Sequence, residues 1–445
     1  MLNLITATLQ AQPYNTIDNI KFEQLSEGLS EKSVTCILQD HKGFMWFGTR
    51  NGLNRYDGVE FKIYEYIYGD STSLSGNFIN SLVEDSIGNI WVGTLDAGLN
   101  LYDRERDIII RHQPQAGDPE SLSDNWISDL YRDSHNNLWV GTEKEGLDLL
   151  QPGTKRFLHF KSDPQNPLGL GNNHVRVIFE DVKSNLWIGT YGGGLDLFDR
   201  KKNKFIHHKH DPNDEHSISS NYLYSHLRDS EGNSWVGTRE GLNLIIENED
   251  GFAFKRFKPN IKDPTGLIHN IVLSIAEDNL GRLWIGMENG ALTIYDKRTQ
   301  SFSNFWPDPL DPTSIGSNSI WSVYKDKMGT MWIGARNRGI NKWDQYHTKF
   351  VHHILPPSGD HKLANNDVLC FAEDEKGNLW IGTDGGGLNY LDRGTNKYTH
   401  FVHDPSDPKT LSSNSVITLK LDSYGDLWIG TWEGGLNRFN KKTGT

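Results

Sequence analysis

The chain has 445 residues and a formal net charge of −13. This acidic balance argues against a surface that follows a phosphate backbone, so a nucleic acid is excluded as the expected partner. The sequence contains no apolar run of roughly 18 residues, which excludes a transmembrane helix. Its two cysteines, Cys36 and Cys370, fall at equivalent points of two repeats and are expected to be small core residues.

The amino terminus has a short apolar stretch within residues 1–12, ending in Gln-Ala-Gln. This stretch resembles the end of a secretory signal peptide, although the positive region that normally precedes it is missing. Residues 1–17 are therefore expected to be either the remnant of a signal peptide or an apolar tail.

The most regular feature of the chain is a tryptophan that recurs at intervals of 45, 48, 48, 48, 49, 48, 48 and 48 residues. Each copy lies in a phrase close to Asp-x-x-Gly-x-x-Trp-x-Gly-Thr-x-x-x-Gly-Leu-Asn. A fixed period of about 40–50 residues with one aromatic residue and several glycines indicates a β-propeller. The nine tryptophans are Trp46, Trp91, Trp139, Trp187, Trp235, Trp284, Trp332, Trp380 and Trp428.

One repeat predicts four strands. In the copy at residues 85–94, Asp85 and Gly88 are typical of a hairpin turn, and the following Ile-Trp-Val-Gly-Thr segment is typical of a strand. The Gly-Leu-Asn phrase begins a third strand, and an aromatic segment before a Pro/Asp-rich loop forms the fourth. No part of the repeat has a sustained 3.6-residue apolar period, so we predict an all-β propeller with four-stranded blades. The tryptophan is expected to pack between adjacent blades, and its glycine to allow close approach.

Nine motifs allow more than one ring arrangement. The other seven links vary around a Pro/Asp-rich loop, most loosely at residues 68–74, whereas the link at residues 355–365 lacks the Asp-Pro phrase and suggests a ring boundary. We therefore expect a seven-bladed propeller at residues 18–350, closed by a strand from residues 21–30, which would remove an exposed edge. Residues 351–445 would be the first two blades of a second, truncated propeller. The alternative is a single ring of eight or nine blades.

Function is expected where the repeats differ, in two loops of each blade that open on one face. One loop follows Trp-x-Gly-Thr, and the other follows a repeated asparagine. Arginine and aromatic side chains on one rim suit an oligosaccharide, especially one that bears carboxylate or sulfate groups. The other interpretation is that these are ordinary loop residues, some of them packed between blades. The candidate ligand-binding residues are Arg50, Trp126, Tyr191, Tyr222, Arg239 and Arg336.

The sequence predicts no catalytic residue, no metal site and no cofactor. The repeated aspartate, such as Asp181, lacks the carboxylate density of a calcium loop. His207 and His208 alternate along a strand, point to opposite faces and cannot both bind one ion. A glycoside hydrolase needs two facing carboxylates, and no pair is singled out among the acidic residues of the rim. These are Glu143, Glu288 and Asp384.

The repeats closely resemble the two-component regulator propeller repeats of hybrid histidine kinases in Bacteroidetes. The resemblance covers about residues 20–440 and is clearest at Gly28-Leu-Ser, at residues 34–49 and at residues 51–58. In that family two seven-bladed propellers precede an immunoglobulin-like sandwich, a membrane helix and kinase modules. The resemblance implies a periplasmic ligand-sensing ectodomain that signals through a homodimer of the full-length protein. It implies no kinase activity for this chain.

Two other functions remain open from the sequence. One is a propeller enzyme, either a glycoside hydrolase or an enzyme similar to streptogramin lyase. The other is a protein-interaction scaffold.

Overall fold

The computed structural model describes residues 20–249, 251–259, 266–345, 363–395 and 397–440. All 35 regular elements in these ranges are β-strands, so the expected all-β fold is confirmed. Within the same ranges there is no helix of the length and apolarity needed to cross a membrane. Contacts between residues divide the chain into two units, Met1–Thr348 and Lys349–Thr445. The amino-terminal stretch expected to be a signal-peptide remnant or tail, residues 1–17, lies outside the described residues.

Six sheets of the first unit each contain four consecutive antiparallel strands, and we number these sheets as blades one to six. Blades one to three are β2–β5 (Val34–Gln39, Met45–Thr49, Gly52–Tyr56, Phe61–Tyr64), β6–β9 (Ile79–Glu84, Ile90–Thr94, Leu99–Asp103, Ile108–His112) and β10–β13 (Ile127–Arg132, Leu138–Thr142, Leu147–Leu150, Phe157–Phe160). Blades four to six are β14–β17 (Val175–Glu180, Leu186–Thr190, Gly194–Asp199, Lys204–His208), β18–β21 (Leu223–Arg228, Ser234–Thr238, Gly241–Asn248, Gly251–Phe257) and β22–β25 (Val272–Glu277, Leu283–Met287, Leu292–Asp296, Ser301–Phe305).

The seventh blade joins the two ends of this unit. Its strands β26 (Ile320–Lys325), β27 (Met331–Ala335) and β28 (Gly339–Trp343) are followed at the outer edge by β1 (Glu23–Leu25), from the start of the chain. β1 pairs antiparallel with β28 along its whole length. The pairing covers the edge that β28 would otherwise expose.

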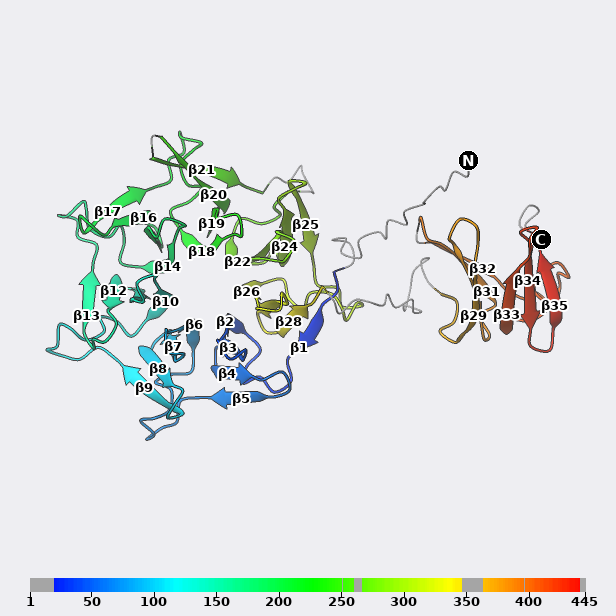
Figure 1. Cartoon of the computed structure of the whole chain (residues 1–445), viewed down its shortest axis with the longest axis horizontal. Helices are drawn as coiled ribbons and strands as arrows, with labels where there is room; N and C mark the ends of the chain where they lie inside the picture. Colours follow the sequence, from blue (N-terminus) through cyan, green and yellow to red (C-terminus); the bar gives the residue numbers. More distant parts are fainter. Residues whose placement is uncertain (1–19, 250, 260–265, 346–362, 396, 441–445) are drawn as a thin grey trace, which may run out of the picture. The chain divides into compact units, whose positions relative to one another are not determined.

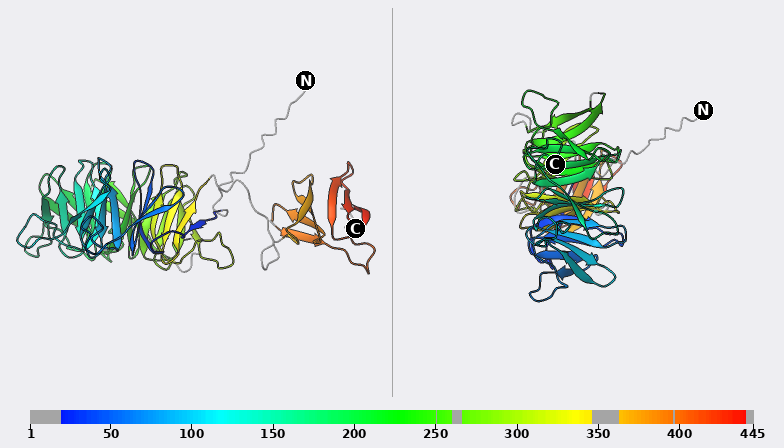
Figure 2. Two further views of the ribbon diagram at one scale, coloured as in Figure 1. Left: turned by 90° about the horizontal axis from the view of Figure 1, so that it is seen from below. Right: turned by 90° about the vertical axis from the view of Figure 1, so that its left-hand side faces the viewer.

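The first strands of the seven blades surround a common centre (Figure 1). β2, β6, β10, β14, β18, β22 and β26 contact one another in this order, and β26 contacts β2. Seen from the side, the strands run between the two faces of this ring (Figure 2). Each face therefore carries one set of loops from every blade.

The motif tryptophans of the first unit pack where two blades meet. The ring of Trp187 is fully buried, and its centroid lies 4.8 Å from that of Phe252 in the next blade. Its Nε1 donates a hydrogen bond to Oδ2 of Asp181 at 3.0 Å. The motif glycine allows the close approach, because a Cβ added to Gly93 would lie 2.6 Å from Cγ2 of Ile127 in the next blade.

The second unit contains two sheets. One is β29–β32 (Val368–Glu373, Leu379–Thr383, Leu388–Asp392 and Lys397–Phe401), and the other is β33–β35 (Val416–Leu421, Leu427–Thr431 and Gly435–Phe439). Most of the link at residues 355–365 lies outside the described residues, which resume at Leu363. Both cysteines are free thiols, and burial raises the pKa of Cys36 to about 12.

Candidate functional site

Two loops of each blade meet on one face of the first unit, which we call the rim face. The backbone N–H of Tyr191, after β15, donates to the carbonyl of His174, before β14, at 2.8 Å. The N–H of Arg239 donates in the same way to Tyr222 at 3.0 Å. In each of these blades the hydrogen bond holds the loop after the second strand against the residue that precedes the first strand. These are the two loops that the sequence analysis placed on one face.

The six candidate ligand-binding residues belong to these loops and are not buried. Arg50, Tyr191, Arg239 and Arg336 are exposed, whereas Trp126 and Tyr222 are half-buried. The contacts of their side chains divide them into three groups. The largest group, which we call the tyrosine cluster, lies at the junction of blades four and five. It contains His174, Arg176, Tyr191, Tyr222, Tyr224 and Arg239.

Aromatic rings form the centre of the tyrosine cluster. The ring centroids of Tyr191 and Tyr222 lie 4.7 Å apart in an edge-to-face arrangement. The His174 ring stacks on Tyr191 at 4.9 Å, and Tyr224 lies 6.2 Å from Tyr191 on another side. This arrangement is favourable for aromatic rings and holds the partly exposed Tyr191 in a fixed orientation.

Two arginines border these rings. The guanidinium of Arg239 lies 5.4 Å from the centroid of Tyr222, and that of Arg176 lies 5.7 Å from the centroid of Tyr224. Burial, and then the nearby charge of Arg176, lower the pKa of His174 to about 4, so its imidazole is neutral at neutral pH. Among the titratable side chains of this cluster, positive charge at neutral pH therefore resides on the two arginines.

A second group, the Trp321 cluster, lies where blades six, seven, one and two approach. The guanidinium of Arg50 lies 4.7 Å from the ring centroid of Trp321 and 5.7 Å from that of Phe78. The guanidinium of Arg336 lies 5.8 Å from the ring centroid of Trp321. Its Nη1 also forms an ion pair with Oε1 of Glu288 at 3.3 Å. Glu288 also accepts a hydrogen bond from Nε1 of Trp321 at 3.2 Å. This rim carboxylate is therefore held by its neighbours.

Trp126 forms the third group with a neighbouring lysine. The ammonium of Lys144 lies 4.4 Å from the centroid of its indole. This cation–π contact covers part of the ring and leaves Trp126 half-buried.

The sequence analysis missed four residues of these groups, Lys144, Arg176, Tyr224 and Trp321. The last three each lie at a register shift in the first strand of their blade. A usable signal was present for these three, because each is the third residue after the repeated asparagine and this position differs in chemistry from blade to blade.

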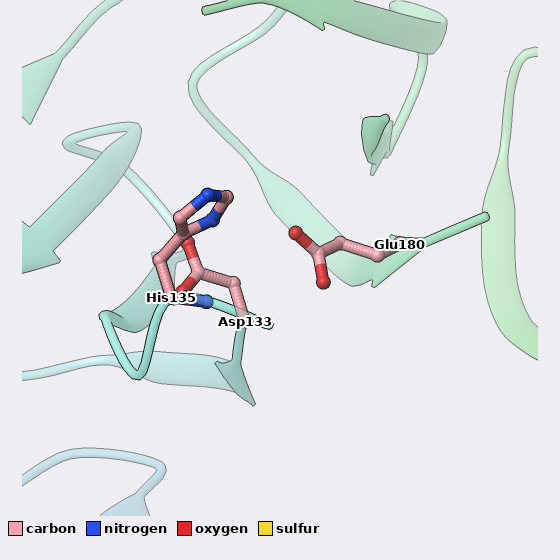
Figure 3. Close-up of side chains that lie close together, drawn as sticks. All are labelled: Asp133, His135 and Glu180. Atoms are coloured by element: carbon pink, nitrogen blue, oxygen red, sulfur yellow. Dashed lines mark hydrogen bonds between the residues drawn. The ribbon is translucent and has the colours of Figure 1, made fainter. Parts of the chain in front are cut away.

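The opposite face contains a group of side chains with metal-ligand chemistry. Ligand atoms of Asp133, His135 and Glu180 lie within 4.8 Å of one another (Figure 3). The guanidinium of Arg200 already binds both carboxylates, at 2.9 Å from Asp133 and 2.7 Å from Glu180. Burial acts to raise the pKa of Asp133, but hydrogen bonds from Asn137, Trp139 and Arg200 hold it below its usual value. A metal ion would have to displace the guanidinium, so these donors suit a structural ion pair.

Ion pairs between a basic residue of one blade and an aspartate of the preceding blade also join other blades of the first unit. Arg104 of blade two binds Asp40 of blade one at 2.7 Å, and Lys297 of blade six binds Asp229 of blade five at 3.0 Å. The recurrence on every second blade indicates that the Asp133 group is a connection between blades.

The family model for the two-component regulator propeller matches the chain eight times. The matches fall at residues 28–51, 73–96, 121–144, 169–192, 266–289, 314–337, 362–385 and 410–433.

Solved structures similar to this chain include extracellular domains of bacterial proteins. One, attributed to a hybrid two-component system of B. thetaiotaomicron, is 28% identical with a TM-score of 0.77, and the match covers 95% of this chain and 54% of that one. A second extracellular domain from the same organism is 23% identical with a TM-score of 0.58, over 95% and 53% of the two chains. Virginiamycin B lyase of Staphylococcus aureus shares the fold, at 12% identity and a TM-score of 0.52, over 73% and 98% of the two chains.

One curated relative is a histidine kinase. Histidine kinase P4 of Formosa agariphila is 43% identical over 75 residues, which is 17% of this chain and 5% of that kinase. This chain therefore spans about half of the similar extracellular domains and a small part of that kinase. The matches place the repeated motif in a known class, because eight segments of the chain are two-component regulator propeller repeats.

Proposed function

We propose that the chain is part of the periplasmic ligand-sensing region of a hybrid two-component histidine kinase. One observation carries this proposal: 95% of the chain aligns at 28% identity with the extracellular domain of a hybrid two-component system. In the full-length protein, ligand binding would be signalled across the membrane through a homodimer. Residues 18–350 would form one complete propeller, and residues 351–445 the start of a second.

The ligand in this proposal is derived from a carbohydrate. The tyrosine cluster offers an exposed ring at Tyr191 and a half-buried ring at Tyr222, and aromatic faces bind the apolar faces of sugars. Arg239 beside Tyr222 adds a planar cation that hydrogen-bonds hydroxyl, carboxylate or sulfate oxygens. The Trp321 cluster supplies a similar combination with Arg50 and Arg336.

The proposed role is sensing without turnover. A glycoside hydrolase needs two carboxylates about 5–10 Å apart on facing loops. Among the rim acids, Glu288 is held by Arg336 and Trp321, and Asp384 belongs to the second unit. The likeness to virginiamycin B lyase, at 12% identity, supports the fold only. Proteins of one fold often have different functions, so the lyase reaction is not carried over.

A thermal-shift screen with product analysis tests this proposal. The purified chain would be heated with plant, algal and host oligosaccharides, and each mixture would be analysed for cleavage products. We expect at least one oligosaccharide to raise the melting temperature and none to be cleaved. Cleavage that Glu143→Gln or Asp384→Asn abolishes would show an enzyme instead. If none of the plant, algal and host oligosaccharides raises the melting temperature, carbohydrate sensing is contradicted.

A further inference from the structure

A belt of seven side chains lines the inner strands of the first unit near the rim face. In β2, β6, β10, β14, β18, β22 and β26 the pairing register shifts at the second residue, so this residue has no partner in the second strand. Arg176 is the only charged residue at these seven positions. The seven residues are Thr35, Asn80, Ser128, Arg176, Tyr224, Leu273 and Trp321.

Side chains of this belt reach toward the next blade. Oγ1 of Thr35 donates to the carbonyl of Ile79 at 2.7 Å, and Nδ2 of Asn80 donates to the carbonyl of Ser128 at 2.8 Å. The side chain of Arg176 also extends toward the next blade, where its guanidinium lies 5.7 Å from the ring centroid of Tyr224. Contact with the face of a ring is not a hydrogen bond, so it leaves the N–H donors of the guanidinium without an acceptor there.

The Nε of Arg176 is buried and has no hydrogen-bond partner among the described residues, a state that it shares with the Nε of Arg55 and of Arg200. Arg200 nevertheless binds Asp133 and Glu180 through its two other guanidinium nitrogens, whereas Arg176 has no ion pair among the described residues. A buried N–H without an acceptor is costly, which favours an acceptor supplied by a bound molecule.

Asp129 has a carboxyl group whose charge interacts with that of Arg176, but it does not supply the missing acceptor. Burial raises the pKa of Asp129 to about 6, while hydrogen bonds and the charge of Arg176 act in the opposite direction. Its two oxygens accept hydrogen bonds from Ser81 and from the backbone N–H groups of Leu130 and Ile178. Asp129 therefore offsets part of the charge of Arg176 without hydrogen-bonding it.

We propose that Arg176 binds an acidic group of the carbohydrate ligand, either a carboxylate or a sulfate. This inference rests on the proposed function and adds a chemical class to it. Guanidinium groups bind such oxyanions through two parallel N–H donors. Tyr191 and Tyr222 would stack on the sugar that bears the group, and Arg239 would bind from the outer side. The preferred ligand is thus an acidic oligosaccharide.

Calorimetric titration with matched sugars tests this inference. The probes are uronate-containing and sulfated oligosaccharides, their carboxyl-reduced and desulfated forms, and neutral oligosaccharides. We expect an acidic form to bind at least tenfold more tightly than its matched neutral form. Arg176→Gln should remove this difference and leave the affinity for the neutral form unchanged, whereas Arg176→Lys should retain part of it. The exposed Arg106→Gln is the control and should retain all of it.

The outcomes separate this inference from the function on which it rests. If no oligosaccharide of any class binds, carbohydrate sensing fails and the inference fails with it. If neutral and acidic forms bind equally well, or if folded Arg176→Gln keeps the acidic preference, the inference is wrong while carbohydrate sensing stands. The melting temperature of each variant establishes that the protein is folded. Uronate and sulfated probes, compared separately, identify which acidic group is bound.

Discussion

Tyr191 and Tyr222 contact each other in two ways, through a backbone β-bridge and through their aromatic rings. They form an isolated antiparallel β-bridge, and their ring centroids lie 4.7 Å apart with an interplanar angle of 77°. The loop after β15 in blade four is thereby held against the entry to β18 in blade five. The backbone bridge does not depend on either side chain, so the rings can be altered without rebuilding the loops.

Tyr191→Ala should weaken binding of the most strongly bound oligosaccharide at least tenfold. Loss of a central aromatic contact typically costs about 2 kcal/mol or more, and about 1.4 kcal/mol is a factor of ten. The free energy of unfolding should fall by about 1 kcal/mol, because the side chain is 36% exposed and loses its edge-to-face contact with Tyr222. Calorimetry and denaturant unfolding measure the two effects.

Tyr68→Ala provides the matched control for this prediction. Tyr68 is 92% exposed and lies in the link between β5 and β6, away from the tyrosine cluster. It should leave the affinity unchanged. Equal losses of affinity in the two variants would contradict the assignment of the rim face as the binding surface.

Trp187→Ala should lower the free energy of unfolding of the first unit by about 3–5 kcal/mol. The indole is fully buried between blades, and its removal would also leave the Asp181 carboxylate without the Nε1 donor. Trp306→Ala is the control because Trp306 is 50% exposed, and its cost should be below about 1 kcal/mol. Similar denaturation midpoints for the two variants would show that the motif tryptophan does not stabilise the junction.

The sequence predicted this part of the fold because every blade repeats it. Asp181 and Trp187 recur at the same spacing in the other motifs, so one hairpin and one packing role could be inferred for all. The turn role of Asp181 was inferred correctly, since its Oδ1 accepts backbone N–H groups of Lys183 and Asn185. Its additional bond to the indole depends on the tertiary position of Trp187, which the turn pattern alone does not reveal.

The candidate site was predicted only in part. The two loop positions identified Tyr191 and Arg239, because loop residues can be counted from the motif. Arg176 and Tyr224 were missed because they lie inside predicted strands, where a register shift changes the direction of the side chain. The ion pair of Arg200 with Asp133 was also missed, since its partners come from different blades that only the ring brings together.

Phe22→Ala should destabilise the whole first unit by about 3–5 kcal/mol. Phe22 precedes β1, is 4% exposed and packs edge-to-face against Trp284 and Phe305 of blade six. The residue therefore anchors the strand that completes blade seven. Denaturant unfolding followed by tryptophan fluorescence measures the loss.

Val59→Ala is a suitable control for the Phe22 variant, because Val59 is 89% exposed. It should leave the midpoint of unfolding unchanged. A Phe22→Ala protein with unaltered stability would contradict the closing role of the amino-terminal strand.

The stability of blades three and four should fall as pH rises above the usual pKa of histidine. Hydrogen bonds to Asp148 and Asp196 raise the pKa values of His159 and His207 above 6.5. A histidine with a raised pKa stabilises the fold while protonated, and this contribution is lost as pH rises through the raised value. Burial also raises the pKa of Asp196 above its usual value of 3.8, which lowers stability as pH rises through that lower range.

A double variant isolates this pH dependence. Asp148→Asn with Asp196→Asn places in blades three and four the residue found at Asn54 and Asn100 in blades one and two. Between about pH 6 and pH 9 its free energy of unfolding should fall less than that of the unaltered protein. Parallel pH profiles for the two proteins would show that these pairs do not contribute.

A crystal structure of the chain with the oligosaccharide that gives the largest thermal shift tests the central claim most directly. We predict sugar density on the rim face of the first unit, stacked on Tyr191 and in hydrogen-bond contact with Arg239. An acidic group of the sugar should lie beside Arg176. Sugar bound only on the opposite face, near Asp133 and Glu180, would contradict the account.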